Sequence, residues 1–522
     1  MFFYRSNVKC QSRVIVSGNW ANIITYWGLS ILLVLLSSIK VEAANPSIDK
    51  AMEALQQAGL KVATDPTRPV YHFLPPAQWM NDPCGGLRYK GYYHLFYQLN
   101  PYGNRQVNSH WGHARSKDLV LWEHLPIALA PTKEEVRCNS GCVTINGHGV
   151  PMIFYTSVRP NGPRQHFAAL GDESLITWTR HPANPILTLD THGGPRFGGG
   201  WSDPFVFEAA KRTFMVIGVD AFGDEVAIPL YEAQDPGLTR WTYKGLLFRA
   251  PRRIIRNMEV PMFFKLDNKW VLLFHPGGPT KYYIGTFDIE TLTFKPEQQG
   301  NLTHNYGQNR SEGVSIEKGF TCPHIFFDDN GRCLFYGWIS GFKDNLGWNG
   351  CLALPRILSI GPDGLLRQQP VPELQKLQIN HFRIHDVDLT HTGYVPENIG
   401  GDTLEIAVEF EPGNAKAFGL KVRRTDDGKN AVVISCDGQE INAAKVKIPF
   451  VITEDKKILK LHIFLDKSVM EVFVNDGREA VSKVIYPGEK DLSLELFAEG
   501  GTAVVKSLDV WEMKSIWSET EE

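Results

Sequence analysis

Trp79-Met80-Asn81-Asp82-Pro83-Cys84-Gly85-Gly86 places a carboxylate between an amide and a proline, just before an apolar run that reads as a β-hairpin. Taken alone, Asp-Pro-Xaa-Gly indicates a turn, because proline fixes φ, glycine accepts positive φ and the aspartate caps the turn. The arrangement recurs, however. Asp203-Pro204 and Glu259-Val260-Pro261 each place an acid directly ahead of another apolar hairpin. The recurrence favours a shared role for the three acids over three unrelated turns.

The hairpins repeat with a period near sixty residues. Apolar, β-rich runs around turns such as Asn-Gly and Asp-Asn-Gly predict five of them, at 86–98, 143–157, 205–219, 262–274 and 324–338. The residues that precede them are Asp82, Gly141, Asp203, Glu259 and Cys322, which stand 59, 62, 56 and 63 residues apart. Strand repeats of this size are typical of radial β-architectures. The repeat predicts an all-β fold that begins with a five-bladed β-propeller over residues 71–369.

The regions before and after the predicted propeller have different sequence patterns. Residues 45–70 read as a helical lead-in, with a short amphipathic helix at 47–62. Residues 370–380 read as a linker with a short helical turn, and residues 381–522 contain alternating apolar runs without intervening helices, which predicts a β-sandwich. This C-terminal part has no cluster of acids like the one upstream, so we expect it to be an accessory domain.

The first 44 residues are typical of an export signal. Three basic residues precede a long stretch without charge, and Val41-Glu42-Ala43 resembles a small-residue cleavage site. The alternative is a retained signal anchor, because residues 14–39 are uncharged and just long enough to span a bilayer. We therefore expect a secreted or periplasmic protein, anchored to a membrane only if the leader is not cleaved.

Composition excludes several classes of protein. Apolar content of 43% and charged content of 21% are those of a globular protein, and a net charge of −3 gives no reason to expect nucleic acid or an anionic membrane surface as partner. There is no Gly-rich phosphate loop and no Gly-Xaa-Ser-Xaa-Gly elbow, so a nucleotide enzyme or a serine hydrolase is disfavoured. We expect no cofactor. The sequence leaves the oligomeric state open.

The eight cysteines are not spaced as zinc ligands. Removal of Cys10 with the leader leaves seven, which allows one or two disulfides in an exported protein and requires at least one free thiol. Dense Asp/Asn/Gly loops of the kind that bind calcium are also missing. We therefore expect no metal.

In a propeller the first strand of each blade lines the central channel, so Asp82, Asp203 and Glu259 would converge there. Two carboxylates about 5 Å apart suit retaining glycoside hydrolysis, in which one attacks the anomeric carbon and the other protonates the leaving oxygen. Glu259 has the most apolar neighbours, which favour the protonated form, and is the expected acid/base. Asp82, beside the amide of Asn81, is the expected nucleophile, and the third carboxylate could stabilise the transition state. The alternative is that the three acids are turn residues or calcium ligands.

Several motifs in order resemble glycoside hydrolase family 32, the β-fructofuranosidase group of invertases, inulinases and levanases. They are Trp79-Met80-Asn81-Asp82-Pro83-Cys84-Gly85, Leu95-Phe96-Tyr97-Gln98-Leu99-Asn100-Pro101, Trp111-Gly112-His113-Ala114, Gly337-Trp338, Leu354-Pro355-Arg356, Pro370-Val371-Pro372-Glu373-Leu374 and Leu461 to Phe473. The resemblance implies a propeller plus sandwich, with Asp82 as nucleophile, Asp203 as transition-state stabiliser and Glu259 as acid/base. The substrate-binding candidates on these motifs are Asn81, Gln98, Trp111, Ser140, Ser202 and Trp338.

The sequence departs from the family where the fructose pocket is expected. The family's Arg-Asp-Pro is Ser202-Asp203-Pro204 here, which loses a bidentate donor to sugar hydroxyls. Its Trp-Glu-Cys-Pro is Met258-Glu259-Val260-Pro261, its Phe-Ser-Gly-Ser is Asn139-Ser140-Gly141-Cys142, and an expected aromatic residue is Gln106. Arg196 or Arg256 could return a positive donor from a neighbouring position.

The favoured hypothesis is an exported retaining hydrolase of sucrose or fructan-type β-fructofuranosides. The alternatives are a propeller that binds glycan without cleaving it, motivated by the lost arginine and aromatic residue, and a hydrolase of another furanoside such as an arabinofuranoside.

Overall fold

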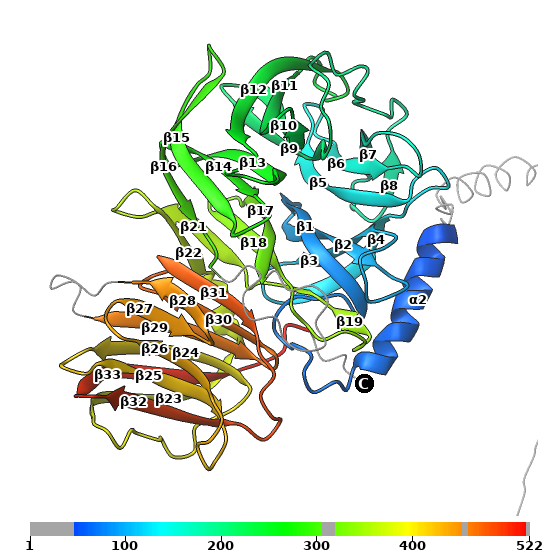
Figure 1. The fold of residues 1–522 in the computed structure, drawn as a ribbon. Helices are drawn as coiled ribbons and strands as arrows, with labels where there is room; N and C mark the ends of the chain where they lie inside the picture. The colour runs from blue at the N-terminus through cyan, green and yellow to red at the C-terminus, as the bar shows by residue number, and fades with distance from the viewer. Residues whose placement is uncertain (1–45, 305–318, 451–457, 518–522) are drawn as a thin grey trace, which may run out of the picture. The chain divides into compact units, whose positions relative to one another are not determined.

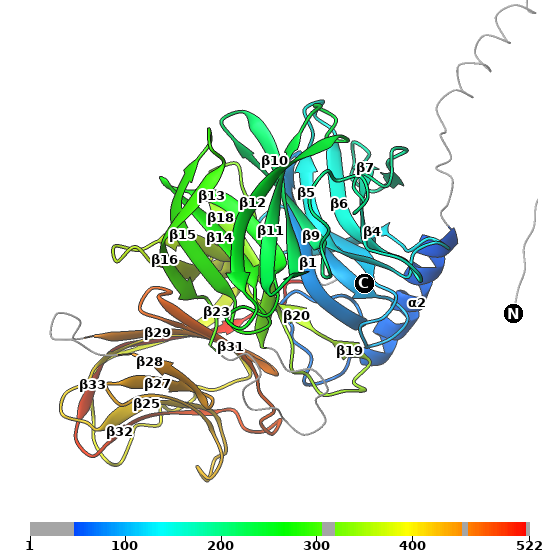
Figure 2. The same ribbon diagram turned by 45° about the horizontal axis from the view of Figure 1, so that its top comes forward.

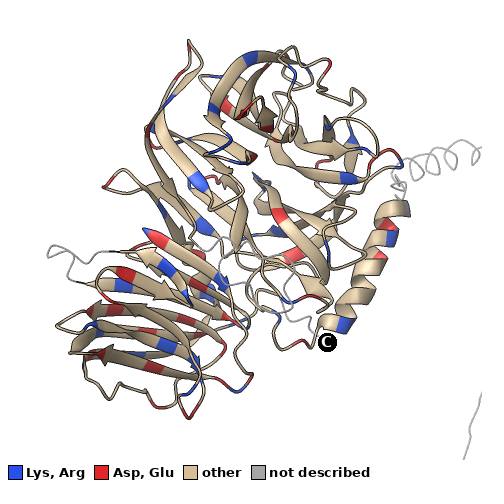
Figure 3. Cartoon of the chain, in the orientation of Figure 1, with Lys and Arg blue, Asp and Glu red and all other residues tan. Residues whose placement is uncertain are grey.

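The computed structural model describes residues 46–304, 319–450 and 458–517, so the predicted leader lies outside the described residues. In these ranges strands form seven sheets, five in the N-terminal part and two in the C-terminal part (Figure 1). The chain is an all-β protein with a five-bladed β-propeller followed by a β-sandwich, as the sequence predicts. Lys, Arg, Asp and Glu are interspersed over the strands (Figure 3). Among the described residues, we find no helix that combines the length and apolar character needed to span a membrane.

The helix α2 (Pro46–Val62) precedes the propeller and places Ala51 and Leu55 in its hydrophobic core. The first blade contains β1 (Gln78–Tyr89), β2 (Tyr92–Asn100), β3 (His110–Ser116) and β4 (Trp122–Leu129), with the short β19 (Trp348–Asn349) added in parallel to β1. The second contains β5 (Arg137–Ile145), β6 (Pro151–Val158), β7 (Gln165–Gly171) and β8 (Trp178–Arg180).

The third blade contains β9 (Ser202–Ala209), β10 (Arg212–Phe222), β11 (Glu225–Ala233) and β12 (Trp241–Pro251). The fourth contains β13 (Glu259–Leu266), β14 (Lys269–His275), β15 (Lys281–Asp288) and β16 (Thr293–Asn301). The fifth contains β17 (Phe320–Phe327), β18 (Cys333–Ile339), β21 (Arg356–Ile360) and β22 (Leu366–Pro370), with β20 (Cys351–Leu352) paired to β18. The first two strands of each blade form the five predicted hairpins.

The innermost strands share one irregularity. Strands β1, β5, β9, β13 and β17 contact one another in sequence, and β17 contacts β1, so the ring is closed. Figure 2 shows β1, β5 and β9 of this ring next to one another. Every inner strand has extra residues relative to its partner strand. The pairing skips one residue between Asn139 and Gly141, Ser202 and Phe205, Glu259 and Met262, and Thr321 and His324, and it skips twice in β1, between Met80 and Pro83 and between Pro83 and Gly85. Such bulges re-aim a side chain that regular pleating would fix. The bulges occur at the residues that define the sixty-residue repeat.

The C-terminal part begins after a 3₁₀ turn, η1 (Pro372–Leu377). One sheet contains β23 (Gln378–Leu389), β33 (Ala503–Met513), β24 (Thr403–Glu411), β29 (Leu459–Asp466), β30 (Val469–Val474) and β31 (Glu479–Val484). The other contains β28 (Val446–Pro449), β27 (Glu440–Ala443), β26 (Val432–Cys436), β25 (Ala417–Arg424) and β32 (Ser493–Glu499). The two sheets enclose a core of their own.

A buried polar network joins the sandwich to the propeller. Arg356 of β21 forms an ion pair of 2.6 Å with Glu471 of β30, and the two side chains are 1% and 0% exposed. The same guanidinium donates to Ser482 at 2.7 Å and to Gln368 at 2.5 Å. Asp466, at the end of β29, accepts hydrogen bonds of 2.8 Å from the backbone N–H groups of residues 70–72. Charged groups at this depth require such partners.

The cysteines of the described residues form no disulfide, although the sequence allows one or two. All seven are buried: Cys84, Cys138, Cys142, Cys322, Cys333, Cys351 and Cys436. Burial raises the pKa of the Cys84 thiol, whose Sγ lies 3.4 Å from the backbone oxygen of Asp82. Cys84 lies on the same strand as Asp82, and its side chain packs in a hydrophobic core. The disulfides that the sequence allows are not found among the described residues, where the buried thiols serve as small apolar groups.

Candidate active site

One cavity brings the three predicted acids together. It has a volume of about 200 Å³ and collects residues from all five blades. Its lining is Asp82, Gln98, Gln106, Arg137, Asn139, Ser140, Arg164, Ser202, Asp203, Asp220, Glu259, Cys322 and Trp338. Asp82 and Asp203 lie within the bulges of two inner strands, and Glu259 directly precedes the bulge of a third. The bulges thus direct side chains from separate sheets into one space.

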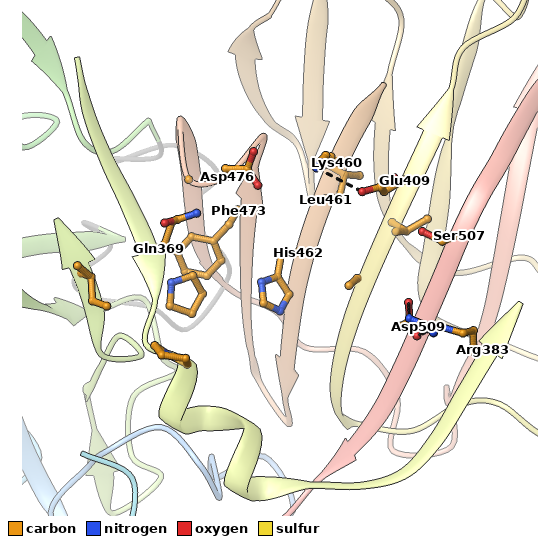
Figure 4. Close-up of a pocket in the computed structure, with 16 residues that line it drawn as sticks. Gln369, Arg383, Glu409, Lys460, Leu461, His462, Phe473, Asp476, Ser507 and Asp509 are labelled. Atoms are coloured by element: carbon orange, nitrogen blue, oxygen red, sulfur yellow. Dashed lines mark hydrogen bonds and ion pairs between the residues drawn. The ribbon is translucent and has the colours of Figure 1, made fainter. Parts of the chain in front are cut away.

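A larger hollow of about 580 Å³ lies elsewhere, lined by β21, β22, η1 and sandwich strands (Figure 4). Two of its acids already have cationic partners. Asp509 pairs with Arg383 at 2.5 Å, and Glu409 pairs with Lys460 at 3.4 Å. Carboxylates neutralised in this way are poor candidates for acid, base or nucleophile. The smaller cavity is therefore the candidate active site.

Asp82 is held by two hydrogen bonds. The Asn81 Nδ2 amide donates to its Oδ1 at 3.0 Å, and the Ser140 hydroxyl donates to its Oδ2 at 2.6 Å. Gln98 Nε2 in turn lies 3.2 Å from Ser140 Oγ, and Trp79 Nε1 donates to Asn81 Oδ1 at 2.8 Å. Both supporting side chains are thus oriented by further buried groups. The carboxylate has a single fixed direction.

Asp203 is held through both its backbone and its carboxylate. Its backbone has a φ of 61°, and its own N–H donates to Thr156 Oγ1 at 2.9 Å. The carboxylate accepts the N–H of Val260 at 3.1 Å. Burial raises the pKa of Asp203 to about 6, with a further contribution from Asp82, although the Val260 hydrogen bond and the Arg164 charge act in the opposite direction. The fold therefore bears a cost for keeping this group ionised at neutral pH.

This cost predicts a pH-dependent stability. Because the pKa of Asp203 is raised in the folded state, this group lowers the free energy of unfolding by up to about 3 kcal/mol as pH rises from about 4 to about 6. Above pH 6 its contribution no longer changes. Asp203→Asn should therefore be more stable than the wild type at pH 7.5, while the two should approach one another at pH 4.5. Urea unfolding at both pH values measures this. A variant that is less stable at pH 7.5 would contradict the argument.

Glu259 projects from between two buried apolar residues, Met258 and Val260. Its own side chain is 34% exposed, so the apolar neighbours noted in the sequence point away from the carboxylate. Asn257 Nδ2 donates to Oε1 at 3.3 Å, and His275 Nε2 lies 3.8 Å from Oε2. Glu259 is thus reachable from the cavity and has His275 as a neighbour. Burial raises the pKa of two other acids of the cavity, Asp203 and Asp220.

Glu259, His275 and Cys322 form a group of possible metal ligands. Their ligand atoms all lie within 4.8 Å of one another. Oxygen, nitrogen and sulfur donors of this kind suit zinc, whose tetrahedral ligand atoms stand roughly 3.5 Å apart. A metal there would occupy the Glu259 lone pairs and so compete with a proton.

Four of the six predicted substrate-binding residues line the cavity: Gln98, Ser140, Ser202 and Trp338. Asn81 and Trp111 do not. Asn81 is buried and supports Asp82 from behind, and Trp111 is fully buried, with its Nε1 donating to the backbone oxygen of Asn139 at 3.1 Å. Both side chains lie in the protein interior, behind residues that line the cavity.

The sequence did not indicate Arg137, Arg164 or Asp220, all of which line the cavity. Arg164 lies in the loop between β6 and β7, outside the repeat positions and motifs that the sequence marks. Asp220, near the end of β10, accepts the N–H of Met258 at 3.0 Å. Among the described residues, neither Arg196 nor Arg256 belongs to the cavity lining.

Comparison with known proteins agrees with this arrangement. Residues 72–370 match the profile described as "Glycosyl hydrolases family 32 N-terminal domain", and residues 373–512 match "Glycosyl hydrolases family 32 C terminal". A levanase of Bacillus subtilis is 32% identical, over 87% of this chain and 71% of the levanase. A sucrose-6-phosphate hydrolase of Escherichia coli is 28% identical, over 85% of this chain and 94% of the relative.

Solved structures show the same fold. A β-fructofuranosidase of Bombyx mori has a TM-score of 0.76 and 24% identity, covering 90% of this chain and 99% of that one. Fructan 1-exohydrolase IIa of Cichorium intybus has a TM-score of 0.74 and 24% identity, covering 86% of this chain and 98% of that one. Since the two profiles together span most of the sequence, the chain belongs to glycosyl hydrolase family 32.

Proposed function

We propose that this chain is a retaining glycosidase that hydrolyses terminal β-D-fructofuranosyl bonds of the sucrose or fructan type. The observation that carries the proposal is the convergence of Asp82, Asp203 and Glu259 on one cavity. A volume of about 200 Å³ is below the roughly 300–1,000 Å³ of pockets that hold drug-sized ligands, and suits one sugar ring at a chain end. The relatives named as levanase and sucrose-6-phosphate hydrolase support the same substrate class.

In the proposed reaction, Asp82 attacks the anomeric carbon while Glu259 donates a proton to the leaving oxygen. Glu259 then takes a proton from the water that hydrolyses the covalent intermediate, which regenerates both residues. The hydrogen bonds from Asn81 and Ser140 suit this role, because they fix the attacking carboxylate before substrate arrives.

Asp203 is proposed to stabilise the positive charge that develops on the sugar ring. A buried anion acts strongly on a developing cation because little water screens it. The free-energy cost of keeping Asp203 ionised is then offset by the attraction between its carboxylate and the positive charge of the oxocarbenium-like transition state. This role requires the ionised form, so activity should rise with pH through the pKa of about 6.

The leader suggests where the reaction takes place. Residues 1–44 carry the pattern of an export signal, and we propose that the mature enzyme is secreted or periplasmic. Recovery of a full-length chain in the membrane fraction, instead of a soluble chain without its first 43 residues, would favour the anchor alternative.

A panel of sucrose, inulin, levan and arabinan tests the substrate class. We expect fructose to be released from at least one of the first three and no arabinose from arabinan. Saturable binding without any released monosaccharide over long incubation would instead identify a glycan-binding propeller. Arabinose release would identify another furanosidase. Asp82→Asn serves as the control for contaminating activity.

A further inference from the structure

The residue before Asp203 is the clearest departure from the family motif in this pocket. The family's Arg-Asp-Pro is Ser202-Asp203-Pro204 here, so the third blade offers a short hydroxyl where a guanidinium is expected. Ser202 is 4% exposed and lines the cavity. The shorter side chain leaves room beside Asp203 for a group from another blade.

Arg164 occupies that position. It precedes β7 in the second blade, lines the same cavity, and its Nη1 donates to Ser202 Oγ at 2.9 Å. The Ser202 hydroxyl donates in turn to the backbone oxygen of Gly200 at 3.0 Å. A hydroxyl has one proton to donate, and that proton is already committed. Ser202 is therefore placed to anchor Arg164 and has no proton left for a sugar.

The charges around Arg164 are consistent with a role in binding a neutral substrate. Burial raises the pKa of both Asp203 and Asp220, and the charge of the Arg164 guanidinium acts in the opposite direction, so it lies within electrostatic reach of the two acids. The cavity wall carries two arginines against four acids, Asp82, Asp203, Asp220 and Glu259. This excess of acids disfavours an anionic ligand and favours hydroxyl groups. A guanidinium presents parallel N–H donors that suit two adjacent hydroxyls.

We propose that Arg164 is the substrate-binding guanidinium of this pocket, reaching the sugar hydroxyls from the second blade, and that Ser202 holds it in position. The inference rests on the proposed function and assigns the lost family arginine a replacement from a different sheet. Neither Arg196 nor Arg256, the candidates that the sequence suggested, takes this place in the described cavity.

The test compares Arg164→Ala with the wild type on the best panel sugar. We expect kcat/KM to fall roughly 10- to 100-fold, the loss that follows from removing one charged hydrogen-bonding group. Arg164→Lys should recover little, because an ammonium cannot reproduce the planar fork. Arg196 is exposed, so Arg196→Ala is the matched control and should match the wild type.

Two rescues separate binding from a merely structural role. Added guanidinium or ethylguanidinium ion should restore part of the activity of Arg164→Ala and should not raise that of the wild type. The double variant Arg164→Ala/Ser202→Arg, which returns the guanidinium to the third blade, should also recover activity. Wild-type kcat/KM in Arg164→Ala, or failure of both rescues, would overturn the proposal.

Fructose binding distinguishes this proposal from the proposed function. Calorimetry should show fructose bound by the wild type and much more weakly by Arg164→Ala. If the wild type hydrolyses no panel sugar yet shows this difference, the hydrolase assignment fails and the role of Arg164 stands. Equal fructose affinity in both proteins would overturn the role of Arg164 alone. No fructose binding by the wild type would overturn both.

Discussion

Asp82→Asn is expected to lower kcat by about 10⁴-fold or more, the scale seen when a catalytic nucleophile is removed. The substitution keeps the size of the side chain and removes the attacking oxygen. Glu259→Gln is expected to lower kcat by about 10²- to 10⁴-fold, the contribution typical of a general acid. Initial rates on the best panel sugar measure both losses, and circular dichroism checks that both variants remain folded.

A substrate with an activated leaving group separates the two roles. β-D-Fructofuranosyl fluoride needs no proton on its leaving group, so Glu259→Gln should keep much of the rate of fluoride release in its first turnover, while Asp82→Asn should not. Later turnovers of Glu259→Gln should be slow, because the same residue activates the water that hydrolyses the intermediate. If both variants lose the first-turnover release equally, Glu259 does not act as the acid. Unchanged sucrose turnover in either variant would remove that residue from the mechanism.

Glu471→Gln is expected to destabilise the folded protein by about 3–5 kcal/mol, because it leaves the buried Arg356 guanidinium without its anion. Both side chains are almost completely excluded from water, so solvent cannot replace the lost partner. Urea unfolding followed by tryptophan fluorescence measures the loss. The transition is expected to become less cooperative, since Arg356 and Glu471 belong to different domains.

The double variant Arg356→Met/Glu471→Leu is the matched control. Replacing both charges with apolar groups of similar size removes the uncompensated charge and should recover most of the stability. A single variant with the urea midpoint of the wild type would show that the pair contributes nothing. A double variant as unstable as the single one would place the contribution in the other hydrogen bonds of the network.

Much of the fold could be predicted because short stretches of the sequence are enough to reveal the repeat. Each blade needs a hairpin with its own turn residues, so a sixty-residue period in apolar runs reveals the number of blades. Arg356 and Glu471 fell in two motifs of the family resemblance, Leu354-Pro355-Arg356 and the run ending at Phe473. Their pairing joins positions 115 residues apart and has no local signal. The absence of disulfides among the described residues could not be predicted either, since a buried free thiol and a paired one look alike in sequence.

The candidate site likewise contains residues that the sequence predicts and residues that it does not. Asp82, Asp203 and Glu259 could be found because each lies at a repeat position on an inner strand. Arg164 could not, because it lies in a loop that no motif marks and reaches Ser202 only through the packing of neighbouring blades. Trp111 is a substrate-binding candidate because it belongs to a motif of the family resemblance, but its side chain is fully buried behind the residues that line the cavity. Sequence pattern identifies which strand a residue is on more readily than which layer its side chain occupies.

The extra residue on every inner strand has a consequence for how such a molecule can change. A residue in a bulge does not take part in the backbone hydrogen bonds that join the two strands. Residues in these bulges can therefore be altered with less effect on the pairing of their sheets. A group lost beside one bulge can be supplied by a neighbouring blade, as with Ser202 and Arg164. In such an architecture, inheritance of the fold and divergence of ligand preference proceed largely independently.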